Sequence, residues 1–280
     1  MSNGLILGFF DGIHKAHRAV IESAFKYADN LIAVTFSESP SVYFNQTEEY
    51  ILSRKDTKNK MQSLGVKTIV EFKFSDIAGM EAEEYIKMLI NKYHPVSIST
   101  GFNHTFGKDK KGNPKILKEL SKKLDFKYEC VDKVTEKDEV VSSTLIKDYI
   151  RKGNVEYANT LLESNFIIDG IVIHGEQIGR TIGFPTANIK YPEKIVKLPY
   201  GVYYVIVNGQ KAIMNWGIKP TVNNTGEPVA EIHILDFNGD LYGHYIRSEV
   251  IKQIRPEQKF DDLNKLKKQI IKDIKECLKL

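Results

Sequence analysis

The chain has 280 residues, of which 42% are hydrophobic and 27% charged, a composition typical of folded globular proteins rather than disordered ones. Its 40 Lys and Arg against 36 Asp and Glu leave a formal net charge of +4, too small over this length to indicate a nucleic-acid-binding surface. The length suits two domains of roughly 100 to 150 residues, each able to bury its own core.

The cysteine content and the hydropathy of the chain indicate in which cellular compartment we expect the protein. Two cysteines, Cys130 and Cys277, lie far apart, which excludes a disulfide framework or a cysteine-based zinc site. No apolar run approaches the roughly 18 residues that cross a bilayer, and the first ten residues lack the basic start of a secretion signal. We therefore expect a cytoplasmic protein that binds neither nucleic acid nor membranes; whether it self-associates stays open.

The first half of the chain alternates short apolar runs with helical patterns. The runs that predict strands are residues 5–10, 31–36, 67–72, 96–100 and 127–134, and the patterns that predict helices are residues 16–27, 58–64, 82–93 and 115–123. Continuous apolar strands separated by helices are typical of a doubly wound α/β domain, with a parallel sheet covered on both faces. Ligands of such sheets bind beyond the carboxyl ends of the strands, so the loops after strands are the candidates for function.

From about Phe166 the pattern changes to short strands punctuated by Gly, Pro and Asn. The predicted strands fall within residues 166–175, 201–217, 230–237 and 245–254. Asn208 and Gly209 accept the positive φ angles of a two-residue hairpin turn between two such runs. The second half is therefore predicted to be antiparallel, as a sandwich or a barrel.

A helix over residues 261–280 is predicted to end the chain. Its apolar stripe has spacings of three and four: Leu263, Leu266, Ile270, Ile274 and Cys277. Its lysines fit a solvated face better than a binding surface. Residues 141–165 predict two short helices broken at residues 152–154, and we place the domain boundary near residues 155–165, giving domains 1–158 and 159–280.

Two histidines, His14 and His17, lie three residues apart where the first strand leads into a helix. Three interpretations are open. A metal site would need further ligands, and no second His or Cys motif stands nearby. The pair could instead be surface or helix-capping histidines. In the third interpretation, protonated or hydrogen-bond-donating imidazoles bind the phosphates of a nucleotide beside the free N–H groups of a helix N-terminus.

Two further segments bear on this choice. Three hydroxyl residues, Ser142, Ser143 and Thr144, can cap a helix and contact an anion, and Lys147 adds a cation one turn later. Capping alone would also explain the hydroxyls. Residues 99–113 follow the fourth strand and could surround a base or ribose, but their glycine spacing and the residue after the lysine do not fit a P-loop.

In this order the segments resemble the bacterial bifunctional riboflavin kinase/FMN adenylyltransferase family, also called FAD synthetase. The family patterns G-x-F-D-x-x-H-x-G-H, G-x-D/N-F-x-F-G and I-S-S-T-x-I-R are similar to three sets of residues: Gly8, Phe10, Asp11, His14 and His17; Gly101, Asn103, Phe106 and Gly107; and Ser142, Ser143, Thr144, Ile146 and Lys147. The kinase pattern G-R-T-x-G-F-P-T-A-N is intact at residues 179–188, and the resemblance covers nearly the whole chain.

The resemblance implies two reactions that use ATP with Mg²⁺. Riboflavin is phosphorylated to FMN, and FMN is then adenylylated to FAD with release of pyrophosphate. In the kinase half, the resemblance implies Glu231 as the catalytic base, with Thr186 and Asn188 as oxygen ligands for Mg²⁺ and phosphate. The other implied kinase contacts, to nucleotide and flavin, are Gly179, Arg180, Asn215 and Arg255.

In the adenylyltransferase half, the resemblance implies that His14 and His17 stabilise charge on the ATP phosphates as pyrophosphate leaves. The implied nucleotide contacts are Gly8, Phe10, Asp11, Asn103, Ser142, Ser143, Thr144 and Lys147. The departures from the family pattern are Ala16 for glycine, Ser37 and Glu38 in place of Asp and Pro, His104 for phenylalanine, and Lys147 for arginine. Losing one charge-assisted hydrogen bond costs about ten- to a hundredfold in rate, so we expect a slower reaction rather than none.

Two alternatives remain beside the bifunctional enzyme. One is a monofunctional member of the family in which only one half is active. The other, from a different functional class, is a catalytically silent regulator that binds flavin or nucleotide. Separate assays with riboflavin and with FMN distinguish all three.

Overall fold

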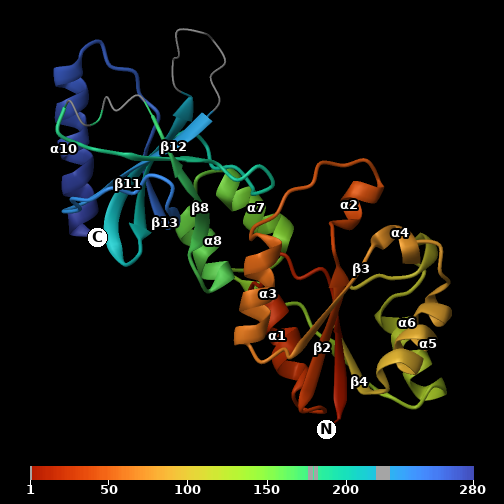
Figure 1. The fold of residues 1–280 in the computed structure, drawn as a ribbon. Helices are drawn as coiled ribbons and strands as arrows, with labels where there is room; N and C mark the ends of the chain where they lie inside the picture. Colours follow the sequence, from red (N-terminus) through yellow and green to blue (C-terminus); the bar gives the residue numbers. More distant parts are fainter. Residues whose placement is uncertain (1, 176–178, 180–181, 219–227) are drawn as a thin grey trace. The chain divides into compact units, whose positions relative to one another are not determined.

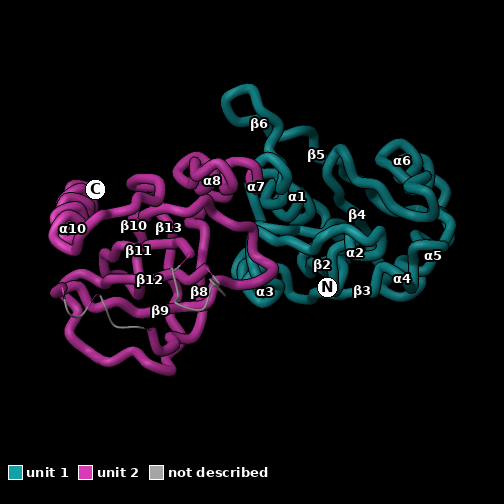
Figure 2. Tube along the Cα trace, turned by 90° about the horizontal axis from the view of Figure 1, so that it is seen from above, with its two compact units in different colours: residues 1–145 teal, residues 146–280 magenta. Residues whose placement is uncertain are grey.

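The computed structural model describes residues 2–175, 179, 182–218 and 228–280, and the chain divides into two compact units (Figure 1; Figure 2). Residues 1–145 form the first unit and residues 146–280 the second. Within the described ranges, no helix combines the length and apolar character needed to cross a membrane.

A five-stranded parallel sheet forms the centre of the first unit, in the order β3-β2-β1-β4-β5. The strands are β1 (Asn3–Leu7), β2 (Asn30–Phe36), β3 (Thr68–Phe72), β4 (Pro95–Gly101) and β5 (Lys127–Val131). The helices are α1 (Lys15–Ala24), α2 (Pro40–Tyr43), α3 (Arg54–Ser63), α4 (Phe74–Ile77), α5 (Ala82–Tyr93) and α6 (Pro114–Lys123). A 3₁₀ turn at Lys108–Lys110 and a hairpin of β6 (Thr135–Glu136) and β7 (Glu139–Val140) complete this unit.

Both faces of the sheet are covered, as the apolar strands predict. Val20 and Ile21 of α1 and Met61 of α3 belong to the core on one face, whereas Leu89 of α5 and Leu117 of α6 belong to the core on the other. The predicted doubly wound α/β domain is confirmed (Figure 1). Because the strand order reverses between β1 and β4, the loops after these two strands flank the position where such sheets bind ligands.

A helix cap and a backbone angle account for two boundaries that differ from the prediction. The helix α3 begins at Arg54 rather than near residue 58, because Ser53 Oγ accepts a hydrogen bond from Asp56 N at 3.0 Å and caps the helix. The first strand ends at Leu7 rather than at Phe10, whose φ of 60° is incompatible with a strand.

The second unit is a closed antiparallel barrel, which decides between the predicted sandwich and barrel. Its strand order is β10-β11-β12-β9-β8-β13. The strands are β8 (Phe166–Ile173), β9 (Ala187–Lys190), β10 (Gly201–Val207), β11 (Gln210–Ile218), β12 (Pro228–Ile234) and β13 (Tyr245–Pro256). Asn208 and Gly209 join β10 to β11 with φ angles of 50° and 82°, as the predicted hairpin requires.

Helices precede and follow the barrel. They are α7 (Ser143–Arg151), which runs across the division between the units, α8 (Val155–Leu162) and the terminal α10 (Leu263–Lys279). Cys277 of α10 is buried against Val202, Tyr204 and Ile213 on the outer face of the barrel. The predicted apolar stripe is wrong at Leu263, which is 56% exposed, because this residue lies in the first turn and the buried contacts come from the last turns.

Candidate active sites

The loop between β1 and α1 has a costly backbone conformation. Phe10, Gly12 and Ile13 have φ angles of 60°, 83° and 46°, so three of four consecutive residues are left-handed. For residues other than glycine, such conformations cost about 1 to 3 kcal/mol each and persist only where the surroundings hold them. Burial of the Phe10 and Ile13 side chains in the core beneath α1 and α3 offsets this cost.

Polar contacts fix the same loop from both sides. The Asp11 carboxylate is 3% exposed, and its Oδ1 accepts a hydrogen bond from Ile51 N at 2.8 Å. Ser143 Oγ donates to the Asp11 carbonyl oxygen at 3.0 Å. Lys60 Nζ lies 3.4 Å from the Gly12 carbonyl oxygen. Residues from distant parts of the sequence therefore define the path of the chain just before His14.

The two histidines form a stacked pair at the start of α1. His14 is the N-cap residue, and its ring lies 3.7 Å from the His17 ring, centroid to centroid. His14 Nε2 is 3.3 Å from Ser143 Oγ, which brings together two of the segments singled out in the sequence. Neither Nδ1 has a hydrogen-bond partner within the described part of the chain. The pair therefore offers polar atoms to a ligand beside the free N–H groups of a helix N-terminus.

Burial decides the charge of these imidazoles. Burial and then the positive charge of Lys60 lower the pKa of His14 to about 4. Burial, His14 and Lys60 lower the pKa of His17 well below its usual value. At neutral pH without ligand, both rings are therefore neutral hydrogen-bonding groups rather than cations.

The structure argues against the surface or capping interpretation for His14. His14 is 3% exposed and its side chain makes no capping hydrogen bond, so it is neither a surface residue nor a side-chain cap. Among the described residues, no group of three or more His, Cys, Asp or Glu side chains could hold a metal ion.

The remaining predicted nucleotide contacts lie on two elements. Ser142 Oγ accepts a hydrogen bond from Leu145 N at 3.2 Å and caps α7, while Thr144 is exposed. Lys147 follows Ser143 by one helical turn. Asn103 is exposed in the loop after β4, on the other side of the sheet reversal from Gly8.

Three polar residues of the barrel lie in one row across three neighbouring strands. In the strand register, Asn188 of β9 is opposite Glu231 of β12, and Glu231 is opposite Asn215 of β11. Directly opposed residues of antiparallel strands point to the same face. The next residue of the row, Val202 of β10, packs against α10, so the row lies on the outer face of the barrel.

The segment before β9 packs closely beside this row. Asn188 is 3% exposed, and a side chain at Gly175 would come within 2.5 Å of its Nδ2 atom. A side chain at Gly179 would collide with the Phe184 carbonyl oxygen at 2.3 Å and reach Thr186 Oγ1 at 3.4 Å. Both glycines therefore allow a backbone approach that a Cβ would block. Arg180 lies outside the described residues.

Arg255 has an intramolecular partner. Its Nε and Nη2 donate to the Asp273 carboxylate at 3.0 and 2.9 Å, and this carboxylate is almost fully buried. The ion pair joins β13 to α10 near the polar row. Arg255 is thereby held in place and positions the terminal helix.

Comparison with known proteins assigns each unit. The family model for FAD synthetase matches residues 2–145, and that for riboflavin kinase matches residues 162–280. The bifunctional riboflavin kinase/FMN adenylyltransferase of Bacillus subtilis is 37% identical over 98% of this chain and 91% of its own length. The corresponding protein of Listeria monocytogenes is 34% identical over 96% of this chain and 89% of its own. The chain belongs to the bifunctional riboflavin kinase/FMN adenylyltransferase family.

One solved structure has the same fold as this chain over nearly the full length of both proteins. It is described as a macrolide-efflux protein from Streptococcus pneumoniae, is 31% identical, covers 98% of this chain and 93% of its own, and superposes with a TM-score of 0.89. The predicted resemblance is confirmed, and the chain belongs to a family of flavin cofactor biosynthesis.

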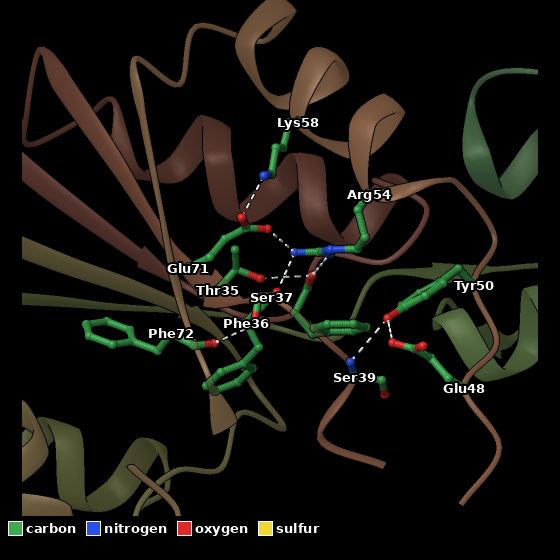
Figure 3. A network of polar contacts seen from close by, with 11 residues as sticks. Thr35, Phe36, Ser37, Ser39, Glu48, Tyr50, Arg54, Lys58, Glu71 and Phe72 are labelled. Carbon is green, nitrogen blue, oxygen red and sulfur yellow. Dashed lines mark hydrogen bonds and ion pairs between the residues drawn. The ribbon is translucent and has the colours of Figure 1, made fainter. Parts of the chain in front are cut away.

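Two groups of side chains in the FAD synthetase unit were not predicted from the sequence. One is an aromatic cluster near the ends of β2 and β3, in which Tyr43, Phe44 and Phe74 have ring centroids 5.3 to 5.9 Å apart and the first two are exposed. The other is a polar network centred on Arg54 (Figure 3). No motif marks either group, because their members come from separate segments; only the run of aromatic residues at 43–44 is visible locally.

Proposed function

We propose that the chain catalyses both reactions of its family, the phosphorylation of riboflavin to FMN and the adenylylation of FMN to FAD. The observation that carries this proposal is that each unit has its own polar site where the corresponding family model matches. In the first unit this site is the stacked pair of His14 and His17, and in the barrel it is the row through Glu231.

In the kinase reaction, Glu231 is the base. The 5′-hydroxyl oxygen of riboflavin attacks the γ-phosphorus of ATP, its proton passes to the Glu231 carboxylate, and the bond to the bridging oxygen breaks to release ADP. The positions of Asn188 and Asn215 on either side of Glu231 support this role, because their amides can orient both the carboxylate and the substrates. General base catalysis of this kind is worth about 10² to 10⁴ in rate.

The residues beside Glu231 fit a magnesium ion that travels with ATP. Hard cations prefer oxygen ligands, and Thr186 and Asn188 supply a hydroxyl and an amide oxygen next to a carboxylate. With few protein ligands, such a site leaves positions for phosphate oxygens and water. When bound, Mg²⁺ neutralises charge on the phosphates. Thr186 and Asn188 would hold it, and Gly179 keeps the neighbouring backbone close enough for phosphate contacts.

In the adenylylation reaction, an oxygen of the FMN phosphate attacks the α-phosphorus of ATP and pyrophosphate leaves. His14 and His17 stabilise the charge that develops on the phosphates, and the N–H groups at the start of α1 add positive potential. Ser142, Thr144 and Lys147 hold the leaving pyrophosphate. Positioning and charge stabilisation dominate phosphoryl chemistry, so no protein nucleophile is needed.

Paired flavin assays of two variants test this assignment. Glu231→Gln should lower FMN formation from riboflavin and MgATP by about 10²-fold or more, while FAD formation from FMN and MgATP stays unchanged. His17→Ala should give the opposite pattern, and chromatography of the flavins measures both. Each unaffected reaction is the control for folding.

Other outcomes point to the alternatives. Activity in one wild-type assay only would indicate a monofunctional enzyme, and activity in neither would leave the flavin- or nucleotide-binding regulator. We also propose a cytoplasmic location, which the two unpaired cysteines support because reducing compartments keep thiols free.

A further inference from the structure

Arg54, the first residue of α3, contacts the ends of three parallel strands. Its Nη2 donates to the carbonyl oxygen of Phe36, the last residue of β2, at 2.6 Å. The same nitrogen lies 3.0 Å from Glu71 Oε1 on β3. Its Nη1 lies 3.5 Å from the carbonyl oxygen of Phe9, two residues beyond β1. Figure 3 shows the guanidinium of Arg54 beside Glu71 and Phe36.

Phe9, which Arg54 contacts, immediately precedes the strained loop at residues 10–13. The Phe9 carbonyl also accepts a hydrogen bond from the buried Thr35 hydroxyl at 3.2 Å. The Arg54 guanidinium carbon lies 4.9 Å from the centroid of the Phe9 ring, in a cation–π contact. Arg54 thus holds both the backbone and the side chain of Phe9. From there the chain passes through the left-handed Phe10 and Ile13 to His14.

A planar guanidinium suits this position and an ammonium does not. Its several N–H groups reach two carbonyl oxygens and a carboxylate at once, and its flat face stacks on a ring. Glu71 balances the charge, and its second oxygen pairs with Lys58 Nζ at 2.6 Å. Lys58 therefore shares the carboxylate partner of Arg54, whereas the contacts to Phe9 and Phe36 described above are made by Arg54. This difference makes Lys58 a matched control.

We propose that Arg54 is a positioning residue for adenylyl transfer, which fixes the Phe9 carbonyl and thereby sets where His14 and His17 meet the ATP phosphates. This inference rests on the proposed adenylylation of FMN. A displacement of a reacting group by about 1 Å costs on the order of 10²-fold in rate, so loss of Arg54 acts on turnover without removing a substrate contact.

The main experiment compares Arg54→Ala, Arg54→Lys and Lys58→Ala in the full chain. Both Arg54 variants should lower kcat for FAD formation by about 10- to 100-fold, with KM for ATP changed less than about threefold. Lys58→Ala should stay within about twofold of wild type. Millimolar guanidinium ion should restore part of the turnover of Arg54→Ala and leave the other proteins unchanged. FMN formation from riboflavin should be unaffected throughout.

Hydrogen exchange of the amides of residues 9–13 provides a readout that does not depend on activity. Exchange should be faster in Arg54→Ala than in Lys58→Ala. Equal kinetics in Arg54→Ala and Lys58→Ala, loss of both activities together, or unchanged exchange would each overturn the positioning role. If the wild-type protein forms no FAD, the proposed adenylylation fails, and the exchange comparison alone decides whether Arg54 holds the loop.

Discussion

His104 has a side chain that its surroundings do not satisfy. The ring stacks on Phe106 with centroids 5.8 Å apart, and its Nε2 is buried with no hydrogen-bond partner in the described ranges. Burial lowers the pKa of His104 to about 4. Leaving a buried polar group unpaired costs about 1 to 3 kcal/mol. The position where the family has phenylalanine therefore carries a stability cost in this chain.

We predict that His104→Phe stabilises the first unit, and more so at acidic pH. The expected gain in free energy of unfolding is about 1 kcal/mol at pH 7, because an unpaired nitrogen is removed. Between pH 6.5 and 4 the unfolded histidine binds a proton that the folded one does not, so wild-type stability falls as the pH drops. At pH 5 the gain should grow by up to about 2 kcal/mol. Urea unfolding followed by far-UV circular dichroism measures it, and a pH-independent difference would contradict the assignment.

At the scale of elements, the terminal helix α10 depends on a charged anchor as well as on apolar packing. Asp273 is 3% exposed and accepts hydrogen bonds from Arg255 and, at 2.7 Å, from Gln269 Nε2. Burying one carboxylate with an arginine is favourable only while both partners are present. Through Asp273, the helix α10 therefore also fixes the position of Arg255, a predicted flavin-site residue.

We predict that Asp273→Ala lowers the free energy of unfolding of the barrel unit by about 2 to 4 kcal/mol, because it leaves Arg255 without its buried partner. Asp261→Ala, which breaks the exposed pair between Asp261, just before α10, and Lys265 of α10, should change it by less than about 0.5 kcal/mol. Trp216, the single tryptophan, is buried in the barrel and reports the transition by fluorescence. Equal effects of the two variants would show that the anchor adds nothing beyond a surface ion pair.

At the scale of the whole molecule, each unit buries a core of its own. The first unit packs helices against both faces of its sheet. The second packs residues inside a closed barrel and more beneath α10. A compact unit with its own core can unfold by itself, so one free energy of unfolding does not describe the chain.

We predict two unfolding transitions. Circular dichroism should detect both, and Trp216 fluorescence only that of the barrel, since the first unit has no tryptophan. His104→Phe should then shift only the transition that fluorescence does not see, and Asp273→Ala only the one that it does. A single coincident transition by both probes, displaced by either variant, would contradict independent cores.

The sequence by itself indicated most of the longer elements and the family to which the chain belongs. Hydrophobic periodicity and turn chemistry are local properties. Apolar runs predicted most of the strands, Asn208 and Gly209 predicted the hairpin, and an intact ten-residue pattern indicated the kinase half. These features need only neighbouring residues, so they can be read along the chain. The family resemblance assigned His14 and Ser143 to one nucleotide site, and their contact was found only in the structure.

The tertiary structure alone decided what depends on contacts between distant segments. Closure of the barrel, the neutral state of His14 and His17, and the ion pair that holds Arg255 follow from burial and from partners far away in the sequence. In the sequence, Arg54 has no feature that separates it from an ordinary helix residue. Only the folded chain brings the ends of β2 and β3 and the residues after β1 into contact with it. Desolvation and charge pairing act through space, and no spacing along the chain encodes them.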